Sequence, residues 1–235
     1  ETAEELAAVD GISRADADAF AVRSHHNAIA ATAAGRFKDE IVPVTVPGRK
    51  GDTTVVDTDE GPREGTTPEV LAKLRPVVRS GGIVTAGNSS SLNDGASAVI
   101  VASERAIREY GLTARARIVD GASAGVPPEI MGIGPVPATQ KVLARSGVKL
   151  SDVGAFELNE AFATQSLACI RRLGVSEDIV NSDGGAIALG HPLGSSGSRI
   201  AITLLNRMER EGASRGIATL CVGVGQGTAM LIEAV

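Results

Sequence analysis

The stretch Asp183-Gly-Gly-Ala-Ile-Ala-Leu-Gly-His-Pro-Leu-Gly-Ser-Ser-Gly-Ser-Arg199 places one histidine, His191, inside a frame of glycines. Glycine lets the backbone take positive φ and approach a ligand closely, and Pro192 restricts the chain directly after the histidine. The frame therefore predicts an imidazole held at a fixed place. Two other interpretations were weighed. A phosphate cradle is disfavoured because no Gly-Lys-Ser/Thr ending follows, whereas a tight turn around a hydrogen-bonded histidine fits the spacing equally well.

A second reactive group, Cys221, follows an apolar strand pattern and precedes Gly223, Gly225 and Gly227. A buried, inert thiol is the usual state of a cysteine in such a strand. The glycines after it favour a functional interpretation, because their N–H groups are free to point at a developing oxyanion. A histidine and a cysteine on glycine loops are typical of acyl chemistry. Cys169 lies in an apolar helical pattern and is predicted to be a core residue.

The sequence Asn159-Glu160-Ala161-Phe162 lies where a predicted strand passes into a predicted helix. One interpretation is structural, since Asn and an acidic residue are favoured at a helix N-terminus. The other is functional, since ligands of α/β proteins bind at the carboxyl ends of strands. Spacing does not decide between them.

Composition narrows the class of protein. The chain has 235 residues, 43% of them hydrophobic, a formal net charge of −5, one Tyr and no Trp. This length supports a sizeable core, and the acidic balance without basic runs or aromatic stacking residues excludes nucleic acid and anionic membranes as expected partners. No apolar run approaches a membrane span. Two cysteines do not form a disulfide framework, so we expect a reducing, cytoplasmic compartment, with any targeting segment lying upstream of Glu1.

Hydrophobic periodicity predicts an α/β layered protein in which helices and strands alternate after residue 112. A capping box is expected at Thr2 and Glu5, and His25 and His26 are expected to face solvent. The polar run through Gly65 is expected to be a surface loop. Helices are predicted over residues 2–10, 14–34, 68–74, 104–110, 136–145, 161–173 and 196–208, and strands over 41–46, 96–102, 116–120, 155–158, 179–181, 216–221 and 228–233.

Three of these stretches resemble the C-terminal signature blocks of the thiolases: Asn159-Glu-Ala-Phe-Ala, the glycine frame of His191, and Cys221-Val-Gly-Val-Gly-Gln-Gly. Their order and spacing also match. Further likeness is found at Lys73-Leu-Arg-Pro, at residues 85–96 and at Met131-Gly-Ile-Gly-Pro, so the resemblance covers the whole chain. It implies the five-layered αβαβα thiolase fold, of which this chain would supply the C-terminal half and part of the loop domain.

The resemblance also implies roles for individual residues. His191 would activate a nucleophilic cysteine and stabilise the thioester oxyanion, and Cys221 would be the second, acid/base cysteine. Asn159 would hold a water in one oxyanion site, and the N–H of Gly223 would serve the other. Coenzyme A would be a substrate, with no tightly bound cofactor and no metal. The positions that fall where family members contact coenzyme A are Arg63, Ala86, Ser90, Met131, Ala161 and Phe162.

Two positions depart from the family pattern. Val224 replaces the middle glycine of the usual Cys-x-Gly-Gly-Gly, and Ser91 stands where glycine is common. A β-branched residue does not easily take positive φ, so Val224 puts the geometry of this loop in question. The family's nucleophilic cysteine has no counterpart here, because neither Cys169 nor Cys221 lies in a matching context.

The domain organisation expected from the resemblance has three parts. Residues 1–92 would be the later part of the loop domain, 93–113 the last strand and helix of the N-terminal half, and 114–235 the C-terminal domain. The expected function is thiolytic cleavage of 3-ketoacyl-CoA, or the reverse condensation of acetyl-CoA, in a homodimer or homotetramer. The chain alone would be inactive without the missing N-terminal half. The alternative is a non-catalytic module that binds coenzyme A or supports assembly.

Overall fold

The computed structural model describes residues 1–235, apart from the side chain of Lys50. Its centre is a four-stranded sheet in the order β3-β6-β5-β4, in which β5 pairs parallel with β4 and antiparallel with β6. The strands are β3 (Ala116–Gly125), β4 (Ala155–Leu158), β5 (Arg215–Val222) and β6 (Gln226–Ala234). The strands predicted at 116–120, 155–158, 216–221 and 228–233 are therefore confirmed.

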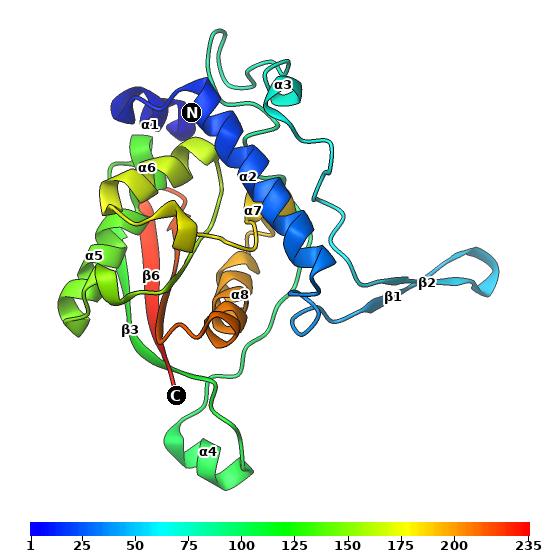
Figure 1. The fold of residues 1–235 in the computed structure, drawn as a ribbon, viewed down its shortest axis with the longest axis vertical. Coiled ribbons are helices and arrows are strands. Elements are labelled where there is room, and N and C mark those ends of the chain that lie inside the picture. The colour runs from blue at the N-terminus through cyan, green and yellow to red at the C-terminus, as the bar shows by residue number, and fades with distance from the viewer.

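The two faces of this sheet carry different apolar clusters, as the period of two requires. Phe156, Ile217 and Leu231 face the larger cluster, whereas Ala155, Ala218 and Ile232 pack with α8. Helix α8 (Ser196–Glu211) lies on one face, with α5 (Pro135–Ser146) and α6 (Ala163–Leu173) on the other side, as Figure 1 shows. Helix, sheet and helix are three of the five layers expected.

Two long N-terminal helices cover the larger cluster. Helix α1 (Thr2–Asp10) packs on α6 and on the 3₁₀ segment η2 (Pro128–Ile133), and α2 (Arg14–Ala33) packs on α6 and α7 (Ala186–Leu189). Ser13 caps α2 with a capping box that includes Asp16. The capping box expected at Thr2 is wrong, because Glu1 is the N-cap of α1 and makes no side-chain cap bond.

The remaining elements are short and lie outside the main layers. An antiparallel ribbon of β1 (Val44–Pro47) and β2 (Thr53–Val56) projects from the body in Figure 1, joined by η1 (Arg49–Gly51). Helix α3 (Pro68–Leu71) begins behind Thr67 as predicted, and α4 (Glu104–Tyr110) has the predicted bounds. The remaining elements are the 3₁₀ segments η3 (Leu150–Asp152) and η4 (Glu177–Ile179).

Three predictions of strand or loop are wrong. The expected loop before Gly65 contains β2, which pairs with β1 and starts the ribbon. Residues 96–102 form no strand, because their backbone pairs with no other strand among the described residues. Residues 179–181 make one isolated bridge, from Val180 to Phe156. Beyond this bridge the side-chain amide of Asn181 replaces a neighbouring strand's backbone. It accepts from Leu158 N at 2.9 Å and donates to Leu158 O at 2.7 Å.

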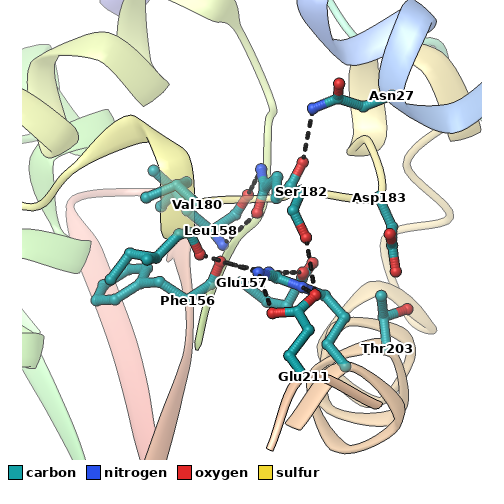
Figure 2. Close-up of polar contacts among 12 residues, drawn as sticks. Asn27, Phe156, Glu157, Leu158, Val180, Ser182, Asp183, Thr203 and Glu211 are labelled. Atoms are coloured by element: carbon teal, nitrogen blue, oxygen red, sulfur yellow. Dashed lines mark hydrogen bonds and ion pairs between the residues drawn. The ribbon is translucent and has the colours of Figure 1, made fainter. Parts of the chain in front are cut away.

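A buried ion pair fastens α8 to the strand that leads into Asn159. Arg207 Nη1 donates to Glu157 Oε1 at 2.7 Å, and both side chains are 1% exposed. The same guanidinium donates to the carbonyls of Phe156 and Ile179 and contacts Glu211. Figure 2 labels Phe156, Glu157 and Glu211, three of the residues that this guanidinium contacts. The position of β4 is therefore tied to α8 by charge as well as by packing.

Candidate functional site

Three residues from separate segments meet at the carboxyl end of β4. Asn159 follows β4 directly, and its N–H donates to Thr219 O of β5 at 3.0 Å. Its Nδ2 lies 3.2 Å from His191 Nε2. The other ring nitrogen, His191 Nδ1, lies 2.6 Å from Ser196 Oγ in the first turn of α8. The predicted neighbourhood of His191 and Asn159 is therefore present, and the imidazole is held at both nitrogens.

The glycine frame lets the histidine loop pack tightly. Gly184 has φ of +86°, and a Cβ there would lie 2.7 Å from Ala28 of α2. Gly190 has φ of +95°, and a Cβ there would lie 2.3 Å from Asn93 Oδ1. The backbone of His191 instead donates to Ser91 O at 3.0 Å and pairs with Leu92 in a parallel bridge. The glycines therefore allow close packing around His191, and the tight turn around a hydrogen-bonded histidine that the spacing allows is present.

Glu160, buried next to Asn159, anchors the loop that precedes His191 by hydrogen bonds. Its carboxylate accepts from Ser24 Oγ at 2.5 Å, from Asn181 Nδ2 at 2.8 Å and from Ile187 N at 3.2 Å. These donors come from α2, from the turn before the glycine frame and from α7. A buried carboxylate that accepts three hydrogen bonds connects these elements. The structural alternative raised for Asn159-Glu160, a helix N-cap with an acidic first turn, is wrong, because Phe162 is the N-cap of α6 and no acidic residue lies in its first turn.

Cys221 lies at the carboxyl end of β5, one strand from Asn159. It pairs with Gly227 across the hairpin to β6, and Gly223, Val224 and Gly225 form the hairpin loop. Val224 takes φ of +61° with its side chain 84% exposed. Val224, which departs from the family pattern, therefore adopts the left-handed conformation that a β-branched residue does not easily take. Ser91 takes no positive φ, and its exposed hydroxyl donates to Asn93 Oδ1.

The protonation of the two reactive groups follows from their surroundings. Burial lowers the pKa of His191 below its usual value, and the positive charge of Arg199 lowers it further. Burial raises the pKa of Cys221 to about 11. At neutral pH the imidazole is therefore uncharged and the thiol keeps its proton. Cys169 is buried in the core as predicted, and burial raises its pKa as well.

Of the six predicted coenzyme A residues, three lie together. Ser90 N and Oγ both donate to Ala161 O, at 3.1 and 3.0 Å, and the preceding Ser89 makes an antiparallel bridge with Phe162. Ala86 lies on the same loop, which Asn88 anchors by accepting from Thr85 N and donating to Asp18. No hydrogen bond between described residues connects Arg63 or Met131 with this group.

Arg63 is instead held by a histidine that the sequence placed in solvent. His25 is 6% exposed, and its Nδ1 accepts from the backbone N–H of Arg63 at 3.2 Å. Burial lowers the pKa of His25, and the charge of Arg63 adds to this. The prediction for His25 is therefore wrong because the loop through Arg63 folds back over α2, whereas His26 is exposed as expected.

Sequence reasoning missed Ser196, Glu160 as a connector, and Asn181. Ser196 occurs five residues after His191 within the quoted glycine frame, so the motif contained it, but only the turn before α8 brings its hydroxyl to the ring. Within the part of the chain that the structure describes, no group of three or more His, Cys, Asp and Glu residues is arranged to hold a metal ion. No described helix is long and apolar enough to cross a membrane.

Comparison with known families settles the relationship that this geometry suggests. The model of the thiolase C-terminal domain matches residues 112–234, and that of the thiolase N-terminal domain matches residues 1–105. The chain belongs to the thiolase family. It is 56% identical to a beta-ketoadipyl-CoA thiolase of Pseudomonas aeruginosa, over all of this chain and 59% of that protein. It is 55% identical to an acetyl-CoA acetyltransferase of the same organism, over 98% of this chain and 59% of the relative.

Solved structures confirm the thiolase fold. A Bacillus anthracis acetyl-CoA acetyltransferase superposes with a TM-score of 0.97 at 46% identity, over all of this chain and 59% of the other. A human mitochondrial 3-ketoacyl-CoA thiolase in complex with CoA gives a TM-score of 0.95 at 46% identity, over all of this chain and 58% of that one. This thiolase chain thus spans about three fifths of the length of the relatives it matches.

Proposed function

We propose that this chain is the C-terminal part of a thiolase that cleaves 3-ketoacyl-CoA with coenzyme A to acyl-CoA and acetyl-CoA, or condenses acetyl-CoA in the reverse direction. The observation that carries the proposal is the contact between His191 Nε2 and Asn159 Nδ2, 3.2 Å apart, at the strand edge that also carries Cys221. The names of the relatives support the same class of enzyme, an acyltransferase that acts on coenzyme A thioesters.

In the proposed reaction, the neutral His191 takes the proton of a cysteine thiol on Nε2. The thiolate attacks the 3-keto carbonyl, and the bond between C2 and C3 breaks to leave an acyl-cysteine and the carbanion of acetyl-CoA. Cys221, which keeps its proton at neutral pH, gives that proton to the carbanion. It then recovers a proton from the thiol of the incoming coenzyme A, whose thiolate removes the acyl group from the cysteine.

The oxyanions of this reaction have candidate donors in the chain. The imidazolium formed at His191 donates from Nε2 to the thioester oxygen, and the N–H of Gly223 would serve the second oxyanion. Asn159 Oδ1 is buried and has no hydrogen-bond partner among the described residues, which suits a side chain that holds a water. Burial of an unsatisfied amide oxygen is costly, so an occupant at this place is physically reasonable.

Coenzyme A is proposed to lie along the loop of Ala86 and Ser90, against Ala161 and Phe162, with Arg63 and Met131 reaching it from other elements. The exposed backbone of the Ala86 loop and the half-buried Ser90 leave this face open to a ligand. No tightly bound cofactor is required, because the chemistry is carried by thiols and an imidazole.

The nucleophilic cysteine is proposed to lie outside these 235 residues. Neither Cys169 nor Cys221 lies in a sequence context that matches the family's nucleophilic cysteine, and Cys221 is already the acid/base of the proposed reaction. In the proposed organisation, residues 1–92 complete the loop domain, 93–113 add the last strand and helix of the N-terminal half, and 114–235 form the C-terminal domain. The assembled protein is proposed to be a cytoplasmic homodimer or homotetramer, consistent with two free cysteines.

The test is acylation of the full-length protein. Incubation with acetoacetyl-CoA and mass spectrometry should find an acetyl adduct on a cysteine upstream of Glu1, and thiolysis should follow the loss of substrate. His191→Ala should abolish adduct formation, whereas His26→Ala, which removes an exposed histidine, should leave it unchanged. The 235-residue chain alone should show no thiolysis.

Two results would overturn the proposal. If the full-length protein binds coenzyme A but forms no adduct on any cysteine, the chain belongs to a binding or assembly module. If the adduct forms on Cys221 in the 235-residue chain, then Cys221 is the nucleophile and the assignment of the two thiols is wrong.

A further inference from the structure

Ser196 contacts His191 but has no role in the reaction proposed above. Its side chain is fully buried, and Oγ lies 2.6 Å from His191 Nδ1. The same hydroxyl donates to Pro192 O at 3.0 Å. Because Pro192 O is a carbonyl, it only accepts hydrogen bonds, and the single proton of the hydroxyl is used there. The oxygen of Ser196 must therefore accept a hydrogen bond from His191 Nδ1–H.

The contact at Nε2, the other ring nitrogen, indicates the same tautomer of His191. Asn159 Nδ2, at 3.2 Å from Nε2, is a donor only. A neutral imidazole has one N–H and one bare nitrogen, so Nε2 accepts from Asn159 while Nδ1 donates to Ser196. Both neighbours thus select the tautomer with hydrogen on Nδ1 and a lone pair on Nε2.

From this arrangement we propose that Ser196 is a positioning residue that fixes the tautomer and orientation of His191, so that Nε2, the nitrogen that takes the thiol proton, carries the lone pair. The inference rests on the proposed function for its purpose, but its geometry stands apart from it. When Nε2 takes the thiol proton, giving imidazolium and thiolate, Nδ1 keeps its own proton and its bond to Ser196. Asn159 Nδ2 is a donor as well, so its hydrogen bond to Nε2 ends once that nitrogen is protonated.

A serine suits this role differently from a carboxylate. A carboxylate at Nδ1 would also select the Nδ1–H tautomer, but its charge would stabilise the imidazolium. Ser196 is neutral, and the charged neighbour of His191 is Arg199, which disfavours the imidazolium. His191 therefore takes a proton only while a thiolate or oxyanion compensates the charge, and then gives it up readily. A base that must release its proton in each turnover needs this property.

The test uses ring-nitrogen NMR and acylation in parallel. In the ¹⁵N-histidine-labelled chain above the pKa of His191, Nδ1 should give a protonated-type shift and Nε2 an unprotonated-type shift. The chain has three histidines, so His25→Gln and His26→Gln variants assign the signals. Ser196→Ala should bring the two shifts toward each other, because both tautomers become populated. In the full-length protein it should slow adduct formation about 10- to 100-fold, a usual loss for a supporting hydrogen bond.

Two matched variants separate positioning from general damage to α8. Ser196→Thr keeps the hydroxyl and should restore both the shifts and the rate. Ser198→Ala removes a hydroxyl from the same helix turn that contacts Ser97 and not the histidine ring, and it should change neither. Protonation of Nε2 in the neutral wild type, or equal losses in Ser196→Ala and Ser198→Ala, would overturn the proposal. If wild type shows the expected shifts but no acyl adduct, the proposed function fails and the tautomer assignment stands.

Discussion

Strand β5, beside Asn159, and the segment from residue 93 to 103 are both rich in small and β-branched residues, yet only the first forms regular structure. β4 and β5 pair with each other, and apolar clusters cover both faces of their sheet. In the second segment Ile100 is 86% exposed and Val101 is 74% exposed, and no strand forms. The difference teaches that an apolar run becomes a strand only when a hydrogen-bonding edge and a covering layer are within reach.

The strongest test of this comparison is the ion pair beneath the sheet edge. Arg207→Met leaves the carboxylate of Glu157 buried without its counter-charge and should lower the free energy of unfolding by about 3–5 kcal/mol. Urea unfolding followed by circular dichroism measures the change. The double variant Arg207→Met with Glu157→Leu should regain most of the loss, because the unpaired charge is gone. A single variant as stable as wild type would show that the pair does not support the site.

The next largest loss of stability is expected at Gly227, which pairs with Cys221 and packs closely against the backbone of Gly134. A Cβ at Gly227 would lie 1.9 Å from the carbonyl carbon of Gly134, so Gly227→Ala must push η2 away from β6. We expect a loss of about 1–3 kcal/mol in unfolding free energy, typical of overpacking. Gly197→Ala adds the same methyl group in open space within α8 and should stabilise the helix by up to about 1 kcal/mol. Equal effects of the two changes would contradict the steric explanation.

Val224 tests the strain in the hairpin loop. Its left-handed backbone costs roughly 1–2 kcal/mol relative to an ordinary conformation, and its side chain is exposed, so little packing offsets this. Val224→Gly removes this strain and should raise the unfolding free energy by about 1 kcal/mol or less, because the greater freedom of glycine in the unfolded chain offsets part of the gain. Val222→Gly, in the extended strand two residues before, should lower it. A loss of stability in Val224→Gly would mean that the valine makes a contact of its own.

The smallest effect is expected in the unpaired segment. Ile100→Ser should change the unfolding free energy of this chain by no more than about 0.5 kcal/mol, as for most surface positions. In the full-length protein, where residues 96–102 are proposed to enter a second sheet, the same substitution should cost about 2–5 kcal/mol. Thermal unfolding of the two proteins measures both values. Equal, small effects would show that the segment stays exposed in the whole protein.

The sequence predicted most of what depends on neighbouring residues. The bounds of β4 and of α4 were predicted without error, because β4 is a short buried run and Ser103 and Gly111 mark the ends of α4. His191 and Asn159 were predicted to share a site, and they do. The strands predicted at 96–102 and 179–181 failed because strand formation depends on a partner that periodicity does not reveal.

The sequence by itself determined which reactive groups the chain has and which residues flank them: one imidazole among glycines, two thiols in different sequence contexts, and an amide after a strand. These follow from residue identity and from backbone freedom, which are local properties. The tertiary structure decided which atoms meet. It buried His25 under Arg63, placed Ser196 on Nδ1 and Asn159 on Nε2 of His191, and held Val224 in a left-handed turn. The contacts of His25 with Arg63 and of Asn159 with His191 join residues 38 and 32 positions apart, and only packing of the whole chain can select them.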